Sequence, residues 1–199
     1  FSFRGLGDEG LALLRKAGDR VGLPTVTQVL EPHDVAAAAS QVDMLELHSG
    51  AMQNFELLRE AGRTGLPVLL RRGPSATLDE LLWSAEYLLA EGDDNVVLVE
   101  RGIRTFGSQR DMLDIGAVPA LKELSHLPVI VDPSHASGGA AKIPAFALAA
   151  QGAGADGLIV EVHPDPAAAR SEGPPQLDAA GFTALMFQLG VSRMRSHID

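Results

Sequence analysis

Short apolar runs recur along the chain, and each of them stops at a cluster of polar residues. Two of these runs, at residues 129–131 and 158–160, are uninterrupted and rich in β-branched side chains. Runs of this kind, bounded by Pro and Gly, are typical of parallel strands that are buried on both faces. Together with four similar runs, they predict strands, polar tips included, at about residues 25–30, 44–48, 67–73, 96–102, 129–135 and 158–163.

Segments with the spacing of amphipathic helices lie between these runs. The clearest begins at Thr77, with Glu80 three residues later as in a capping box, and extends to about Ala90. Further helices are predicted at about residues 8–17, 34–39, 53–61, 118–124, 144–150 and 178–194. Strands that alternate with helices form parallel sheets with right-handed crossovers. The fold class is therefore α/β: either an open sheet or about six of the eight strands of a (β/α)8 TIM barrel, with the first two strands missing.

The composition narrows the class of protein. The 199 residues, 46% of them hydrophobic and 21% charged, can bury a substantial core, so we expect residues 1–199 to be one partial barrel domain. A net charge of −10 argues against nucleic acid as a partner. The sequence has neither an apolar run long enough to span a membrane nor the pattern of a signal peptide. Because cysteine is absent, a cytoplasmic location is expected.

Side chains that are able to bind a metal ion follow two of the predicted strands. His135 and Glu161 stand at or near the carboxyl ends of their runs, where the loops of parallel α/β folds converge on a common mouth. Imidazole together with carboxylate suits a divalent ion such as Mn, Fe, Co or Zn. The alternative is that the histidine is a buried core residue with an ordinary hydrogen-bond partner.

Arginines at neighbouring tips indicate an anionic substrate. Arg71 and Arg101 end adjacent predicted strands, and the guanidinium group forms planar, doubly bonded contacts with carboxylate or phosphate. A net acidic protein can still bind a phosphorylated metabolite through such a local cluster. The alternative is that these arginines form ion pairs with Glu46 or Glu100.

Four blocks of the sequence closely resemble the 3-deoxy-7-phosphoheptulonate synthase family, in particular the class related to 3-deoxy-octulosonate 8-phosphate synthase. They are Met52-Gln53-Asn54 and residues 100–106, 127–136 and 153–164, in the order in which the family has them. The resemblance implies a (β/α)8 barrel. It also implies an aldol-type condensation of phosphoenolpyruvate with erythrose 4-phosphate that depends on a divalent metal ion.

The resemblance assigns metal ligands. His135 and Glu161 match ligands of the family, and Glu172 stands where the family has an aspartate ligand. The family's first strand carries a cysteine ligand and its second carries a Lys-Pro-Arg-Thr segment for the substrates; both would precede Phe1. If two strands are absent, the bare edges of the sheet should be covered by a partner, so a homo-oligomer is expected.

The resemblance also assigns residues that contact the substrates. Arg101 matches an arginine that holds phosphoenolpyruvate, and Arg71 stands where the family has a lysine for the same substrate. We expect Arg71 and Arg101 to be the catalytic residues. Together with Arg104 and Asp132, which also lie at or just beyond strand ends, they are expected to bind the substrates.

Two positions depart from the family pattern. An arginine that serves phosphoenolpyruvate is expected at Gly50, and His48 nearby is unusual for the family. Restoring an arginine at residue 50 is expected to strengthen phosphoenolpyruvate binding, provided that Arg71 does not occupy the same volume. The departures leave two other interpretations open: a divergent non-catalytic paralogue that acts as a scaffold or regulatory partner, and a synthase for another sugar phosphate.

Overall fold

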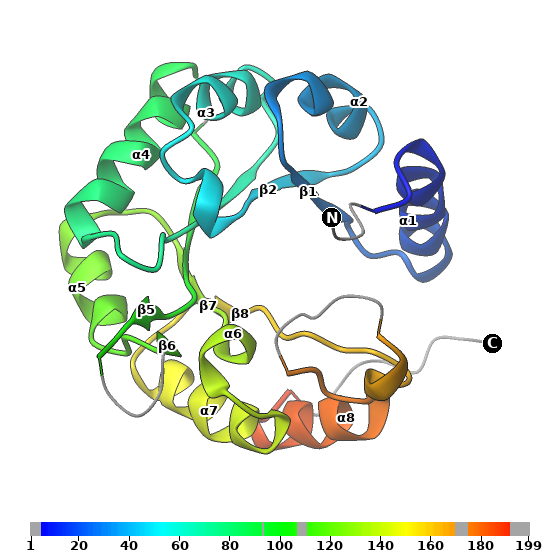
Figure 1. Cartoon of the computed structure of the whole chain (residues 1–199), viewed down its shortest axis with the longest axis vertical. Coiled ribbons are helices and arrows are strands. Elements are labelled where there is room, and N and C mark those ends of the chain that lie inside the picture. The colour runs from blue at the N-terminus through cyan, green and yellow to red at the C-terminus, as the bar shows by residue number, and fades with distance from the viewer. Residues whose placement is uncertain (1–4, 93, 107–110, 170–174, 192–199) are drawn as a thin grey trace.

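The main sheet consists of six parallel strands in the order β1-β2-β3-β4-β7-β8. The computed structural model describes residues 5–92, 94–106, 111–169 and 175–191. The strands curve into an incomplete ring, with β1 and β8 at its open edges (Figure 1). A (β/α)8 architecture represented by six strands is thereby confirmed. The strands are β1 (Val26–Val29), β2 (Met44–Leu47), β3 (Val68–Arg71), β4 (Val96–Glu100), β7 (Val129–Val131) and β8 (Gly157–Leu158).

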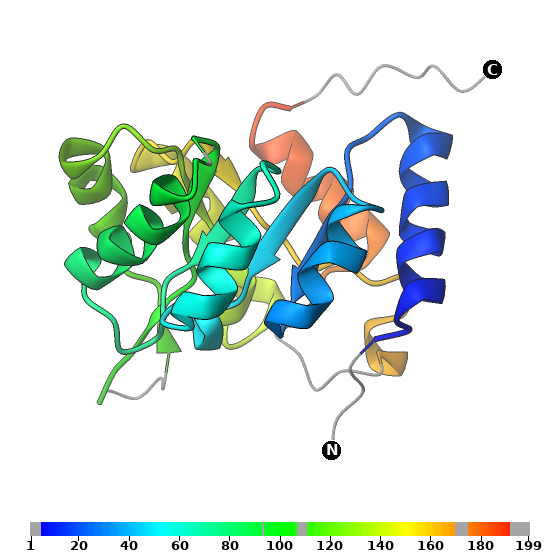
Figure 2. The same cartoon turned by 90° about the horizontal axis from the view of Figure 1, so that it is seen from above.

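Helices cover the convex side of this sheet (Figure 1, Figure 2). They are α1 (Asp8–Val21), α2 (Val35–Ala39), α3 (Phe55–Gly62), α4 (Leu78–Ala90), α5 (Ala117–Leu124), α7 (Ile143–Gly152) and α8 (Ala179–Gln188). Single turns of 3-10 helix occur at η1 (Pro32–Asp34), η2 (Ser49–Ala51), η3 (Ala140–Lys142) and η4 (Pro166–Ala168). The capping box predicted for α4 is present, because Glu80 N donates to Thr77 Oγ1 at 3.2 Å and Thr77 N donates to Glu80 Oε2 at 2.7 Å.

The hydrophobic core lies between the sheet and the helices. Alternate strand residues face this layer, because successive side chains of a strand point to opposite faces. Leu45, Leu70 and Leu98 are fully buried there, and Leu57 of α3 and Leu81 of α4 belong to the same cluster. The residues that alternate with them along each strand therefore face the concave side of the ring.

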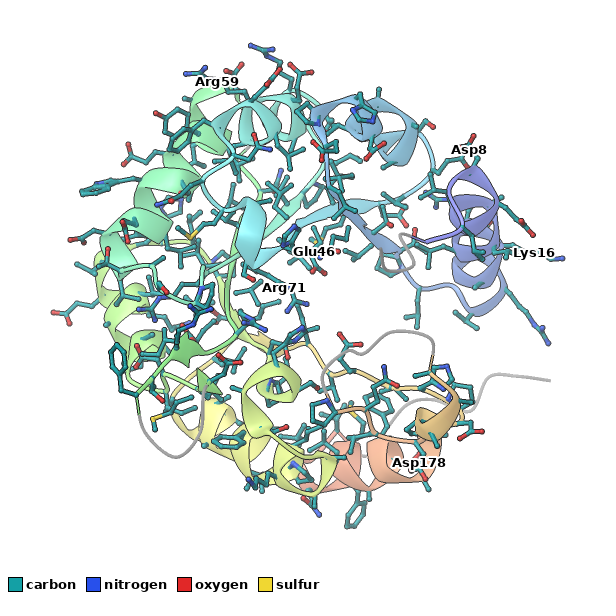
Figure 3. The ribbon with its side chains drawn as sticks, in the orientation of Figure 1. Asp8, Lys16, Glu46, Arg59, Arg71 and Asp178 are labelled. Carbon is teal, nitrogen blue, oxygen red and sulfur yellow. The ribbon has the colours of Figure 1, made fainter. Side chains whose placement is uncertain are left out.

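The concave side carries charged residues at the ends of the strands. Glu46 on β2 and Arg71 on β3 point into the ring, whereas Arg59 on α3 lies on the outer surface (Figure 3). The β3–β4 register places Arg71 beside Val99, so Arg101, two residues further on, belongs to the same face. The alternation that builds the core therefore also collects the polar tips on one surface.

The predicted strand at 129–135 is wrong at its polar tip. β7 ends at Val131, and a short helix, α6 (Pro133–Ser137), follows it. Asp132 causes the change, because its Oδ1 accepts from the backbone N–H groups of Ser134 and His135 at 3.0 and 3.2 Å. Proline at the first helical position also favours this start.

Other differences from the predictions lie at the ends of two elements and in one hairpin. The strand predicted at 158–163 is paired only at Gly157–Leu158, and Val162 forms an isolated bridge with Leu177. An antiparallel hairpin of β5 (Ile103–Arg104) and β6 (Asp111–Met112) was not predicted. It projects from the end of the sheet toward which the strands run (Figure 2). The final helix ends at Gln188 instead of about residue 194, and residues 192–199 lie outside the described part.

Within the described ranges, no helix is long and apolar enough to cross a membrane.

Candidate active site

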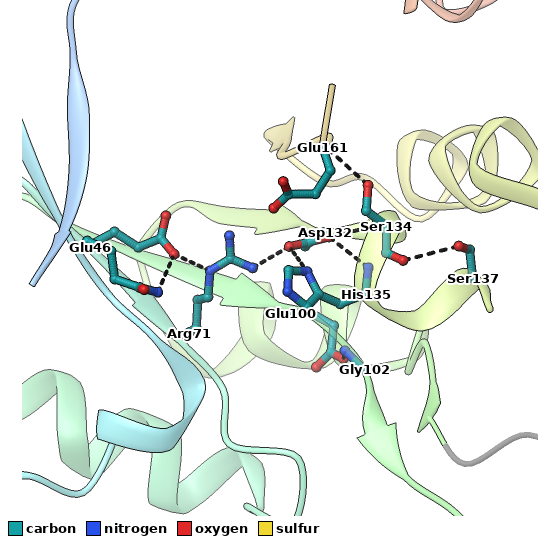
Figure 4. Close-up of polar contacts among 10 residues, drawn as sticks. Glu46, Arg71, Glu100, Gly102, Asp132, Ser134, His135, Ser137 and Glu161 are labelled. Carbon is teal, nitrogen blue, oxygen red and sulfur yellow. Dashed lines mark hydrogen bonds and ion pairs between the residues drawn. The ribbon is translucent and has the colours of Figure 1, made fainter. Parts of the chain in front are cut away.

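The predicted site residues meet at the carboxyl ends of the strands. Glu46, Arg71, Asp132, His135 and Glu161 come from β2, from β3 and from the segments after β7 and β8, and they lie on one surface (Figure 4). Together with Arg101, which follows β4, the five parallel strands from β2 to β8 contribute to one mouth. This placement is the one expected for the active site of a parallel barrel.

Arg71 joins three strands through two ion pairs. Its Nε donates to Glu46 Oε1 at 2.6 Å, and its Nη1 donates to Asp132 Oδ2. The Arg71 side chain is 6% exposed. Burial opposes its charge, but the two carboxylates outweigh burial, so the pKa of Arg71 lies above its ordinary value. The alternative from the sequence is that the arginines form ion pairs with Glu46 or Glu100. For Arg71 the ion pair with Glu46 is present.

Asp132 is completely buried and accepts four hydrogen bonds from the protein. Besides the two N–H groups at the start of α6, it contacts Arg71 and His135, whose Nδ1 lies 2.7 Å from Asp132 Oδ2. Burial alone would raise the pKa of the Asp132 carboxyl, but His135 and Arg71 hold it below its usual range. The ionised carboxylate therefore links the Arg71 guanidinium to the His135 imidazole. Its expected contact with substrate stays a prediction.

The geometry around His135 suits a metal ligand in part. Since Asp132 binds Nδ1, the other ring nitrogen, Nε2, is left to bind a metal ion. A carboxylate that holds the far side of the imidazole is the usual support of a metal-bound histidine. Glu161 is positioned beside α6 by its backbone N–H, which donates to Ser134 Oγ at 3.0 Å. The described residues contain no group of three or more candidate ligands, and Glu172 lies outside them. His135 and Glu161 can thus supply two ligands of a shell that other groups must complete.

The two remaining arginines differ in their surroundings. Arg101 is half-buried, and among the described residues it has no ion-pair partner within 4.0 Å. Burial lowers its pKa, Asp132 and Asp111 oppose that shift, and Arg71 adds to it. Arg104 is exposed on the β5–β6 hairpin, which is tied to the mouth by its backbone N–H donating to Pro74 O at 2.6 Å. Arg101 is therefore the cation best placed to receive an anion.

A buried ion pair that the sequence reasoning did not assign lies directly behind the mouth. Arg72 Nη1 donates to Glu100 Oε2 at 2.8 Å and to Asp114 Oδ2 at 3.0 Å. Burial raises the pKa of Glu100, and the hydrogen bond from Arg72 opposes that rise. The sequence contained the signal for this pair. Arg72 directly follows Arg71 and Glu100 directly precedes Arg101, so the side chains of Arg72 and Glu100 point to the opposite face, toward the helices.

This pair also shapes the segment that carries Arg101. Glu100 Oε1 accepts from Gly102 N at 2.7 Å. Gly102 has φ +102, and a Cβ there would lie 2.9 Å from Ala136 Cβ of α6. Only glycine allows β4 to end so close to α6. The contacts on both sides of Arg101 therefore fix where its side chain starts.

His48 and Gly50 fit one another at the end of β2. Gly50 N donates to His48 Nδ1 at 2.9 Å, which caps the η2 turn. A Cβ at residue 50 would lie 2.6 Å from His48 Cε1. The volume expected to be free for an arginine at residue 50 is therefore taken by His48, and Arg71 is not the obstacle.

Comparisons with known proteins agree with the fold. The profile of the DAHP synthetase I family matches residues 1–193. The chain is 44% identical over 190 residues to the phospho-2-dehydro-3-deoxyheptonate aldolase of Thermotoga maritima, covering 95% of this chain and 56% of that protein. It is 35% identical over 210 residues to a 2-dehydro-3-deoxyphosphooctonate aldolase of Acidithiobacillus ferrooxidans, covering 100% of this chain and 72% of that protein.

Solved structures give the same result. The crystal structure of the Thermotoga maritima aldolase superposes with a TM-score of 0.93 at 43% identity, over 96% of this chain and 57% of that one. A truncated form of 3-deoxy-D-arabino-heptulosonate 7-phosphate synthase from the same organism gives a TM-score of 0.91 at 42% identity, over 96% and 72%. The chain thus spans little more than half the length of its full-length Thermotoga relative. On the family profile, the sequence identity and the shared structure, this chain belongs to the DAHP synthetase I family.

Proposed function

We propose that the protein carries out the aldol-type condensation of phosphoenolpyruvate with erythrose 4-phosphate to give 3-deoxy-arabino-heptulosonate 7-phosphate. The observation that carries the proposal is the meeting of Arg71 and Arg101 with His135 and Glu161 at one mouth of a barrel of this family. Two cations beside two potential metal ligands suit a reaction between two phosphorylated molecules.

The arginines take different parts in the proposal. Arg101, which has no ion-pair partner among the described residues, binds the phosphate or carboxylate of phosphoenolpyruvate. Arg71 is held in place by Glu46 and Asp132 and presents its remaining N–H groups to the same anion. Arg104, on the exposed hairpin, is suited to the phosphate of the sugar. Positioned cations of this kind stabilise the charge of the reacting anion without reorganisation.

The reaction forms one carbon–carbon bond. C3 of the enol attacks the aldehyde carbon of the sugar phosphate, water adds at C2, and inorganic phosphate leaves from C2. His135, Glu161 and Glu172 would hold a divalent ion such as Mn, Fe, Co or Zn, whose chemistry is the Lewis-acid polarisation of an oxygen. The residues of the mouth bind the anions and keep their reacting carbons close together.

A synthase for another sugar phosphate is the second candidate. The 35% identity to an octonate aldolase supports it, since a product with eight carbons requires a five-carbon sugar in place of erythrose. A non-catalytic paralogue is a third possibility, supported by the two carboxylates that already pair with Arg71 and by the missing side chain at Gly50.

The proposal also includes a homo-oligomer in the cytoplasm, with neither nucleic acid nor membrane as a partner. Its support is the open edge strands β1 and β8, the absence of cysteine and the net charge of −10.

The test measures product from defined substrates. The protein is incubated with phosphoenolpyruvate and either erythrose 4-phosphate or a five-carbon aldose phosphate, with Mn²⁺ added or removed by chelator. Released phosphate and the sugar acid are quantified by ³¹P and ¹³C NMR. The proposal expects product with the four-carbon sugar, and much less with Arg101→Ala. Product only with the five-carbon sugar would favour the second candidate, and binding of phosphoenolpyruvate without turnover would favour the non-catalytic one.

A further inference from the structure

His48 is a donor at the mouth that the proposed function has not used. It follows β2 directly. Glu46 lies two residues earlier in the chain, so both side chains are on the same face of the strand. Its ring is half-buried. The charges of Glu46 and Arg71 both act on this ring, which places it in the surroundings of the anion site.

The contact with Gly50 fixes which nitrogen of His48 carries the proton. Nδ1 accepts the backbone N–H of Gly50 at 2.9 Å, so a neutral ring must carry its hydrogen on Nε2. Burial lowers the pKa of His48, Glu46 opposes that shift, and Arg71 adds to it. The imidazole is therefore a neutral N–H donor near pH 7. Among the described residues, no hydrogen-bond partner for Nε2 is found.

The position of the ring is tightly defined. It covers Gly50 so closely that a Cβ at residue 50 would lie 2.6 Å from Cε1 and 3.1 Å from Nδ1. A side chain at residue 50 and an imidazole at residue 48 in this orientation exclude one another. The donor at the end of β2 thus comes from residue 48 and is neutral.

The geometry points to His48 Nε2–H as a substrate-binding, specificity-determining donor that contacts an oxyanion group of phosphoenolpyruvate beside Arg71. The inference rests on the proposed function and deepens it. Arg71 is already balanced by Glu46 and Asp132, so a further donor that adds no charge and needs no counter-ion strengthens the site without disturbing these pairs. The shared chemistry is an oxyanion, which is either the carboxylate or the phosphate of the substrate.

Two substitutions of His48 separate the role of Nε2 as a donor from the role of Nδ1 in capping the η2 turn. His48→Asn retains an oxygen near the position of Nδ1 that can accept from Gly50 N, but it removes the donor at the position of Nε2. His48→Gln retains an N–H donor near the position of Nε2 but loses the cap. His126→Asn is the matched control, because His126 is exposed and lies before β7, at the opposite ends of the strands.

Calorimetric titration with phosphoenolpyruvate, at one pH and salt concentration, is the main measurement. His48→Asn is expected to weaken binding roughly tenfold or more, as the loss of a hydrogen bond to a charged group would. Its thermal unfolding midpoint should stay at the wild-type value. His48→Gln should retain more affinity than His48→Asn, and His126→Asn should bind as wild type does. Parallel titrations with inorganic phosphate and with pyruvate assign the contact to the group whose binding is weakened more.

The outcomes distinguish this inference from the proposed function. If wild type binds phosphoenolpyruvate and His48→Asn binds it equally well, the donor role is wrong while the proposed function stands. If wild type does not bind phosphoenolpyruvate, both are wrong. Ring ¹⁵N shifts of labelled histidine give an independent readout: protonated Nε2 and unprotonated Nδ1 at residue 48 are expected, and the opposite tautomer would overturn the inference.

Discussion

Glu46 and Arg71 form a nearly buried ion pair at the mouth, with 2.6 Å between Glu46 Oε1 and Arg71 Nε. The pair orients the guanidinium, but the carboxylate also competes with any anion that Arg71 could bind. The same contact therefore supports the site geometrically and weakens its positive charge.

The first prediction follows from this competition. Glu46→Gln keeps the size of the side chain and removes its charge, so phosphoenolpyruvate should bind more tightly, by roughly fivefold or ~1 kcal/mol. Titration calorimetry checks the change, and Glu56→Gln, on the exposed surface of α3, serves as the control. Weaker binding by Glu46→Gln would mean that the orientation of Arg71 matters more than its net charge.

The second prediction concerns the ion pair of Arg72 and Glu100 behind the mouth. Arg72→Met leaves a fully buried carboxylate without its main partner, so the free energy of unfolding should fall by about 3–5 kcal/mol. Arg72→Met combined with Glu100→Gln should recover much of this loss, because the buried charge is then gone. Urea unfolding of wild type, Arg72→Met and the double variant measures the loss and its recovery. A double variant no more stable than Arg72→Met would contradict this account.

A third prediction tests whether His48 blocks residue 50. Gly50→Arg alone should strengthen phosphoenolpyruvate binding little or weaken it, because its Cβ would meet the imidazole. His48→Gly combined with Gly50→Arg removes the obstacle and should bind more tightly than either single variant. Calorimetric affinities of the four proteins give the coupling between the two sites, which should be clearly non-additive. Additive effects would show that the ring moves aside at little cost.

The fourth prediction is the pH dependence that Asp132 contributes. Its pKa in the folded protein lies below the ordinary value of an aspartate, so its stabilising effect is present above that ordinary value and is lost as the pH falls through the folded pKa. Asp132→Asn should therefore differ most from wild type in free energy of unfolding above about pH 4, and the difference should shrink below it. Urea unfolding over the acid to neutral pH range measures this. Asp19→Asn, exposed on α1, is the control, and a constant difference across the range would contradict the assignment.

The last prediction concerns metal binding. His135→Ala should strongly reduce the metal content of protein prepared with Mn²⁺, since the remaining ligands no longer close the shell. Elemental analysis of dialysed protein is the measurement, with His126→Ala as the control. Equal metal content in wild type and His135→Ala would exclude His135 as a ligand.

The sequence by itself determined the alternation of strands and helices and the strand ends that carry the candidate site. Apolar runs such as Val129–Val131 are local signals, since β-branched residues between turn residues favour a strand whatever surrounds them. The capping box at Thr77 is equally local. The blocks of sequence around Arg101, His135 and Glu161 are likewise sufficient on their own to indicate the family.

Only the tertiary structure decided which polar side chains contact one another. Arg71 and Arg72 are neighbours in sequence, yet one pairs with Glu46 and Asp132 on the concave face and the other with Glu100 behind it. Asp132 resembles a strand tip in the sequence but serves as a helix cap. His48 and Gly50 exclude a side chain that the sequence pattern leads one to expect. The ion pairs of Arg71 and Arg72 depend on distances between atoms of different strands, which are set by how the strands curve and pack together and which no local pattern of residues specifies. The Asp132 cap and the His48–Gly50 contact each lie within one segment and depend on the backbone conformation that the chain adopts after the strand.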